Sequence, residues 1–69
     1  MKIIHRKNIR RILSAQAGDS MVIVKSAKYG FIWAGRAKFT FTNFRNEFFS
    51  KFPEQVNRDS TGALVIIMN

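Results

Sequence analysis

The sequence predicts an α+β fold, with a helix, a three-stranded antiparallel meander, a second helix and a C-terminal strand in that order. Apolar residues recur at helical spacing near residues 6–17 and 44–52, and apolar and polar residues alternate along residues 29–42. Residues 63–68 are continuously apolar, which is typical of a buried strand. We therefore expect one basic domain, residues 1–69, with both helices on one face of the sheet and the opposite face free to bind.

The first helix is expected over about residues 6–17. Ile9, Ile12 and Leu13 form an apolar stripe at the spacing of one helix face, and Gly18 follows as a suitable C-terminal residue. Basic residues crowd its first half, where the helix dipole favours anions. A bound phosphate would offset this placement, and a merely solvated face is the alternative. These basic residues are Arg6, Lys7, Arg10 and Arg11.

The next strand is expected at Met21–Ser26, which carries β-branched residues on both faces. A short connection leads to residues 29–42, YGFIWAGRAKFTFT, which we expect to form a β-hairpin that turns near Gly35 and Arg36. This segment contains five of the nine aromatic residues of the chain. The orientation of the hairpin therefore determines which aromatic side chains reach solvent.

The length of that turn leaves two registers open. A two-residue turn at residues 35–36 would place Tyr29, Phe31 and Trp33 on one face beside a lysine, and would point the phenylalanines of the second arm into the core. A three-residue loop at residues 34–36 would place all five aromatic side chains on one face, which would then be the core. Glycine at the first turn position favours the first register, whereas the segregation of apolar from polar residues favours the second.

The second helix is expected over about residues 44–52, with a phenylalanine stripe at positions 44, 48 and 52 that would form part of the core. Pro53 ends this helix, and the segment to Gly62 is a polar connection rich in turn-forming residues. The last strand is expected at residues 63–68. An exposed edge beside it would allow two copies to pair, so a homodimer through an edge strand is one expected partner arrangement.

The composition favours a polyanionic partner. Twelve lysine and arginine residues against four acidic residues give a formal charge of +8, which attracts polyanions and weakens as salt is added. We expect DNA or RNA, ahead of an acidic protein surface. The absence of cysteine excludes disulfides and thiolate zinc sites and fits a reducing, cytoplasmic location. The longest apolar run, residues 63–68, is too short for a membrane span, and we expect no secretory signal.

Few residues point to catalysis. His5 is the single histidine, and no two carboxylates have a spacing that indicates a shared site. A small ribonuclease or toxin built from His5 and nearby cations is conceivable but has little support. We therefore expect a protein that is not an enzyme, with no catalytic residues, no metal site and no cofactor.

Interleaved aromatic and basic residues favour nucleic-acid binding, because bases stack on exposed rings while cations hold the backbone. The expected binding residues are Arg6, Lys7, Arg10, Arg11, Lys28, Tyr29, Phe31, Trp33, Arg36 and Lys38.

The expected strands with IWAGRAKFTFT in the middle, followed by a helix, are loosely similar in layout to small DNA-binding proteins that use a sheet face, such as archaeal chromatin proteins and the arm-site domains of phage integrases. That resemblance implies a sheet lying against a duplex groove, with Trp33 as a wedge. The alternative function, from a different class, is a small phage-type inhibitor or adaptor that docks its positive face on an acidic protein surface.

Overall fold

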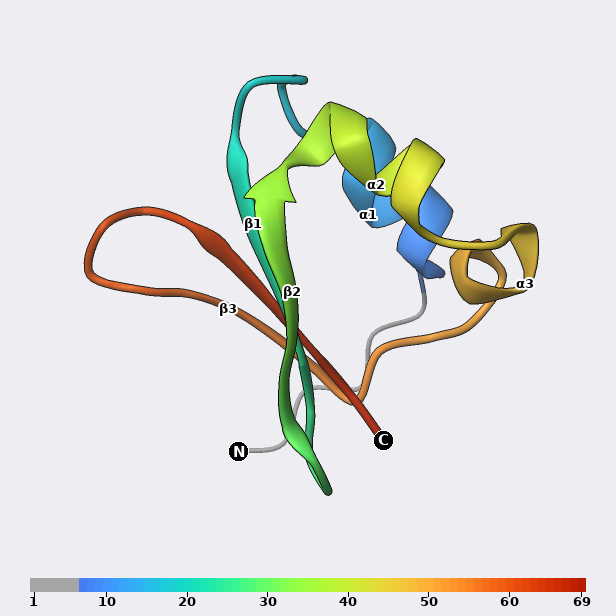
Figure 1. Cartoon of the computed structure of the whole chain (residues 1–69). Helices are drawn as coiled ribbons and strands as arrows, with labels where there is room; N and C mark the ends of the chain where they lie inside the picture. The colour runs from blue at the N-terminus through green and yellow to red at the C-terminus, as the bar shows by residue number, and fades with distance from the viewer. Residues whose placement is uncertain (1–6) are drawn as a thin grey trace.

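A computed structural model describes residues 7–69, which form a four-stranded mixed sheet with helices on one of its faces (Figure 1). The elements in chain order are α1 (Ile9–Ser14), β1 (Met21–Ser26), β2 (Gly30–Arg36), α2 (Ala37–Asn43), α3 (Asn46–Phe49), β3 (Gln55–Arg58) and β4 (Leu64–Met68). The predicted α+β class is confirmed. None of the helices in residues 7–69 is long and apolar enough to cross a membrane.

The sheet has the strand order β2-β1-β4-β3 and is mixed rather than purely antiparallel. β1 pairs with β2 in the antiparallel direction and with β4 in the parallel direction, while β3 and β4 are antiparallel. β4 therefore lies inside the sheet, which explains why Leu64, Val65 and Ile66 are all buried. The expectation of an exposed edge beside this strand is wrong, because β1 and β3 pair with its two sides.

The predicted hairpin at residues 29–42 does not form in either register. β2 continues through Gly35 and Arg36 and passes directly into α2. Ala37 and Thr40, one helical turn apart, are buried, and the Thr40 Oγ1 donates a hydrogen bond of 2.7 Å to the carbonyl oxygen of Ala37. Burial of the small side chains of Ala37 and Thr40 against the rest of the protein outweighs the strand-like alternation of phenylalanine and threonine. Since residues 37–43 are helical, the layout behind the resemblance to sheet-face DNA binders is absent.

The actual hairpin joins β1 to β2 through residues 27–29. Gly30 follows with φ of +85°, a backbone conformation that glycine adopts without a steric penalty. The Ser26 Oγ accepts hydrogen bonds of 3.1 Å from the backbone N–H groups of Lys28 and Tyr29. These bonds hold the turn in a defined shape at the lower end of the sheet in Figure 1.

The expected helix over residues 44–52 is interrupted. Phe44 lies in extended backbone as the C-cap of α2, so only the short α3 follows. Phe44 and Phe48 are half-buried, whereas Phe49 is buried at 2% exposure and Phe52 is 56% exposed. The predicted phenylalanine stripe is therefore only partly in the core, because the break at residue 44 changes which side chains face inward.

β3 lies within the segment expected to be a polar connection. Of its residues only Val56 is apolar and half-buried, because β3 is an edge strand with a solvated face. The Oδ1 of Asp59 then closes the turn by accepting hydrogen bonds from the N–H groups of Thr61 and Ala63 and from the Thr61 hydroxyl. The strand expected from residue 63 is confirmed as β4.

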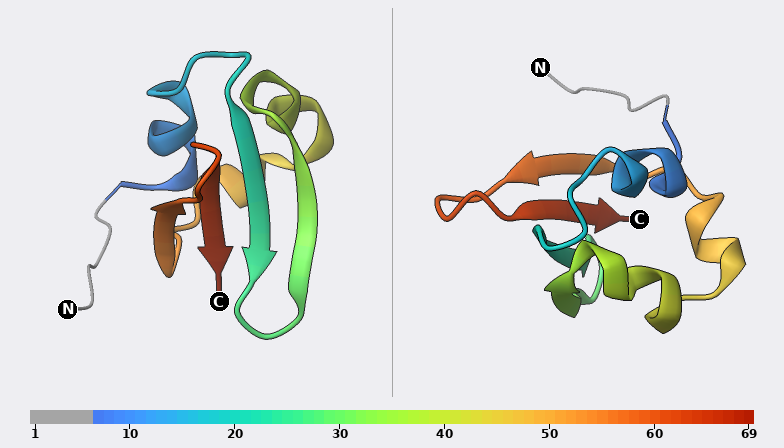
Figure 2. Two further views of the ribbon diagram at one scale, coloured as in Figure 1. Left: turned by 90° about the vertical axis from the view of Figure 1, so that its left-hand side faces the viewer. Right: turned by 90° about the horizontal axis from the view of Figure 1, so that it is seen from above.

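α1 is shorter than expected, but its predicted apolar stripe of Ile9, Ile12 and Leu13 is buried. The Asn8 side chain caps it by accepting a hydrogen bond of 3.0 Å from the Arg11 backbone N–H. The buried core between helices and sheet comprises Ile9, Ile12, Leu13, Val22, Val24, Ala37, Phe49, Leu64 and Ile66. The helices thus cover one face, and the other face is turned to the viewer in the left view of Figure 2.

Candidate functional site

The face of the sheet without helices is the first candidate surface. Val22 and Val24 of β1 are buried under the helices, so Met21, Ile23 and Lys25 point the other way. Strand register adds the residues that lie opposite these three on β2 and β4. We call this surface the open sheet face; it comprises Met21, Ile23, Lys25, Phe31, Ala34, Arg36, Val65 and Ile67.

One aromatic side chain and two cations lie on the open sheet face. Phe31 is 65% exposed and is the cross-strand partner of Lys25, while Arg36 is the partner of Met21. None of the four strands contains an acidic residue. The open sheet face therefore combines an apolar floor with positive charge.

A β-bulge separates Phe31 from Trp33, which regular alternation along the strand would place on one face. The register shifts between Val24 and Lys25, so that Trp33 lies opposite Val24 and Phe31 lies opposite Lys25. Trp33 is half-buried on the helix side, where its ring meets Phe44 edge to face with centroids 5.5 Å apart. The expectation that Tyr29, Phe31 and Trp33 share one face is wrong, because the extra residue changes the alternation.

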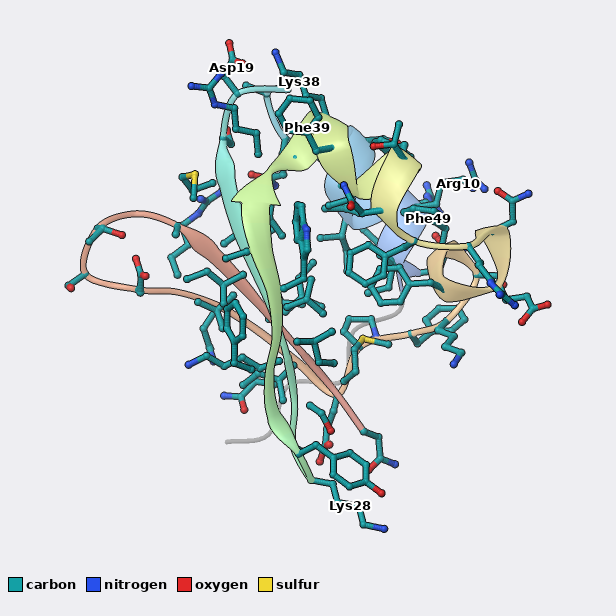
Figure 3. All side chains as sticks on the ribbon, viewed as in Figure 1. Arg10, Asp19, Lys28, Lys38, Phe39 and Phe49 are labelled. Carbon is teal, nitrogen blue, oxygen red and sulfur yellow. The ribbon has the colours of Figure 1, made fainter. Side chains whose placement is uncertain are left out.

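Lys28 and Tyr29 lie at the tip of the β1–β2 turn. Tyr29 is 80% exposed, and the Lys28 Nζ lies 5.4 Å from the centroid of its ring. Figure 3 shows Lys28 projecting beyond the end of the sheet. Both predicted site residues are accessible there, although they lie at the end of the strands rather than in the middle of the open sheet face.

The cations of α1 lie on the opposite side of the molecule, among the helices. The backbone N–H of Ile9 donates a hydrogen bond of 2.9 Å to the Lys51 carbonyl oxygen, and the Arg10 guanidinium lies 5.5 Å from the Phe49 ring centroid (Figure 3). These contacts join α1 to the residues on either side of α3. Two exposed cations lie there, Arg45 and Lys51, which the sequence analysis missed. We call Lys7, Arg10, Arg11, Arg45 and Lys51 the helix-side cations.

The predicted site residues are therefore divided between two sides of the protein. Phe31 and Arg36 lie on the open sheet face, whereas the described cations of α1 and Trp33 lie on the helix side. Arg6 lies outside the described residues, as does His5. The basic residues that flank the phenylalanines at 48 and 49 were the available sequence signal for the missed cations, but only the contact of α1 with α3 brings them together.

Asp19 partly neutralises one end of the sheet. Its Oδ1 lies 3.1 Å from the Lys38 Nζ and 3.8 Å from the Arg36 Nη1 (Figure 3). The hydrogen bond from Lys38, and then the attraction of Lys38 and Arg36, lower the pKa of the Asp19 carboxyl. Among residues 7–69, Asp19 is the only acidic residue in an ion pair. Most described cations thus keep their charge available to a ligand.

Asp19→Asn is expected to change how stability depends on pH. A carboxyl group whose pKa is lowered by folding stabilises the protein above its ordinary pKa of 3.8 and loses that contribution as the pH falls through the lowered value. The melting temperature of the variant should therefore lie below that of the wild type at pH 6, and the two should converge at low pH. Melting curves followed by circular dichroism between pH 2 and pH 7 measure this difference.

Asp59→Asn is the matched control. The hydrogen bond from Thr61 is the largest cause of the lowered pKa of Asp59. The change in melting temperature caused by Asp59→Asn should therefore vary with pH but depend little on salt. The Asp19 effect should shrink as salt is added, because its pair with Lys38 is exposed and screened. A salt-independent Asp19 effect would contradict the proposed ion pair.

The described residues show no sign of a metal centre. Residues 7–69 contain no group of three or more histidine, cysteine, aspartate or glutamate side chains placed to hold a metal ion.

Comparisons of the chain with protein-family models, with curated proteins and with solved structures found no match.

Proposed function

We propose that the protein binds nucleic acid through the open sheet face. The observation that carries this proposal is the cross-strand pair of Lys25 and Phe31 on a face that no helix of the described chain covers. An exposed ring can contact bases or sugars while the adjacent ammonium group holds a phosphate. Arg36 lies at the end of the same face, 3.8 Å from the Asp19 carboxylate, and its planar guanidinium has further N–H groups for a second phosphate.

The charge distribution supports this proposal. The formal charge of +8 favours association with any polyanion, and no acidic residue in the strands opposes a phosphate on the open sheet face. The helix-side cations lie across the sheet from this surface. Their part is to raise the positive potential around the whole protein, rather than to touch a duplex that lies on the open sheet face.

A pair of charge reversals tests the proposal. Lys25→Glu and Arg11→Glu change the net charge equally, but Lys25 lies on the open sheet face and Arg11 is an exposed residue of α1. We expect Lys25→Glu to lower the affinity for a short DNA duplex about tenfold and to reduce its salt dependence. Arg11→Glu should lower the affinity only about two- to threefold, through long-range attraction. Fluorescence anisotropy with a labelled duplex over a range of salt concentrations measures both.

Removal of exposed rings provides a second comparison that does not change the charge. Phe31→Ala removes the ring of the open sheet face, whereas Phe39→Ala removes a similarly accessible ring from α2. Only Phe31→Ala should weaken binding. Equal effects within each pair would remove the open sheet face as the binding surface, and no binding of any oligonucleotide at low salt would remove the function.

An inhibitor or adaptor that docks on an acidic protein is the second candidate function. Its specific support is the apolar part of the open sheet face, where Met21 and Phe31 are exposed beside Ile23. Apolar residues at the centre of a charged surface are typical of protein interfaces. This function would be favoured if the protein bound no oligonucleotide but bound an acidic protein through these same residues. A cytoplasmic location belongs to both proposals.

A further inference from the structure

A groove of about 310 Å³ lies at the end of the sheet where β1 and β4 finish. It separates the β1–β2 turn from the connection between α2 and α3, on the helix side of the sheet. Its walls include Tyr29, Ile32, Phe44, Phe48, Lys51 and Met68. The groove is distinct from the open sheet face, and its volume is that of a small ordinary ligand site, roughly 300 Å³ or more.

The groove has rings and apolar side chains held at fixed positions. Phe44 and Phe48 stack on one another with centroids 4.2 Å apart and an interplanar angle of 18°. The β-bulge turns Ile32 into the same groove, where it is 48% exposed although it is a large apolar residue. Tyr29 stands at the rim on the turn that the Ser26 hydroxyl fixes. A planar apolar ligand would therefore find a preformed site.

The charges around the groove indicate that its ligand carries anionic groups. Lys51 contributes to the wall, and the Lys28 Nζ lies over the Tyr29 ring at the rim. Among the described residues that line the groove there is no aspartate or glutamate, and its other polar residues include Ser26 and Asn69. The site thus suits a flat ring that is covalently joined to anionic groups.

We propose that this groove receives one unstacked base of a single-stranded nucleic acid. The base stacks against Tyr29 and the apolar wall, and the phosphates on either side of it lie near Lys28 and Lys51. A base inside a duplex is covered by its neighbours and cannot enter, so the groove gives the protein a preference for single strands. This inference rests on the proposed function, but it concerns a different surface and can fail separately.

Two residues of β2 provide a matched test. Ile32→Glu places a carboxylate in the groove, and Ala34→Glu places one on the open sheet face two residues away, with the same change in charge. Both positions are exposed, so both variants should remain folded, which circular dichroism verifies. The probes are a labelled ten-nucleotide oligo(dA) and a short blunt-ended DNA duplex, measured by fluorescence anisotropy.

We expect Ile32→Glu to lower the affinity for oligo(dA) about tenfold and that for the duplex less than twofold. Tyr29→Ala should give the same selective loss, without any change in formal charge. Ala34→Glu should weaken binding of both probes.

Unchanged oligo(dA) affinity in both groove variants overturns the base site while leaving the open sheet face intact, and would assign the groove to an apolar side chain of a protein partner. Equal losses for both probes also overturn it. If the wild type binds neither probe at low salt, the proposed function fails together with this inference.

Discussion

Phe49→Ala is expected to lower the free energy of unfolding by about 3–5 kcal/mol. Phe49 is the largest fully buried side chain of the described core. Its ring stacks on Phe41 with centroids 5.1 Å apart and meets Phe48 edge to face at 5.4 Å. Removing it leaves a cavity between α1, α2 and α3, because the centroid of the same ring also lies 5.5 Å from the Arg10 guanidinium of α1. Small domains are stabilised by only about 5–15 kcal/mol, so this loss is a large fraction of the total free energy of unfolding.

Phe52→Ala is the matched control, because it deletes the same group from an exposed position three residues away. It should change the free energy of unfolding by no more than about 0.5 kcal/mol. Urea unfolding followed by circular dichroism measures both. If Phe49→Ala is too unstable to give a baseline, Phe49→Leu retains part of the buried area and should give a smaller, measurable loss. Equal effects at positions 49 and 52 would contradict the packing of α3.

The sequence predicted the elements whose pattern agrees with their final burial. Only a helix places Ile9, Ile12 and Leu13 on one face, where all three side chains can be buried together, and they are buried in α1. Residues 63–68 are apolar on both sides, which requires an interior strand, and β4 is one. In both cases the local pattern and the tertiary environment favour the same structure.

The hairpin prediction failed where local pattern and tertiary environment disagree. Alternation of phenylalanine with threonine after Lys38 is typical of a strand, but the fold buries Ala37 and Thr40 instead. The backbone N–H of Ala37 also donates a hydrogen bond of 2.8 Å to the Ser20 carbonyl oxygen, which fixes the start of α2 against the chain before β1. That contact joins residues far apart in sequence, so no pattern within residues 29–42 could reveal it.

The candidate site was predictable in its residue types and not in its geometry. The aromatic and basic composition is plain in the sequence, and Phe31, Lys28 and Tyr29 are accessible, although the two registers left open by the sequence did not decide this for the two rings. The β-bulge that turns Trp33 to the helix side inserts one residue into the register, and a single extra residue reverses which face a side chain occupies. Nothing in the composition of β2 marks that position.

Gly35→Ala is expected to lower the free energy of unfolding by about 1–3 kcal/mol, because its methyl group would collide with the indole of Trp33. A Cβ at position 35 would lie 2.6 Å from Cζ2 and 2.9 Å from Cη2 of that ring. The ring is rigid and is held from another side by Phe44. It must move toward solvent to make room, so the emission maximum of Trp33 should shift to longer wavelength. Urea unfolding and the emission spectrum of the folded variant measure these two effects.

A double-mutant cycle separates this collision from backbone strain. In the Trp33→Leu background, Gly35→Ala should be nearly neutral, which would give an interaction energy of about 1 kcal/mol or more. Gly30→Ala is the control on the same strand: it has φ of +85° and no atom within 4 Å of its added Cβ. Its cost of roughly 1–2 kcal/mol comes from the left-handed backbone and should be the same with and without Trp33. If Gly35→Ala costs as much in the Trp33→Leu background as in the wild type, the indole does not lie over Gly35, and the placement of Trp33 on the helix side is wrong.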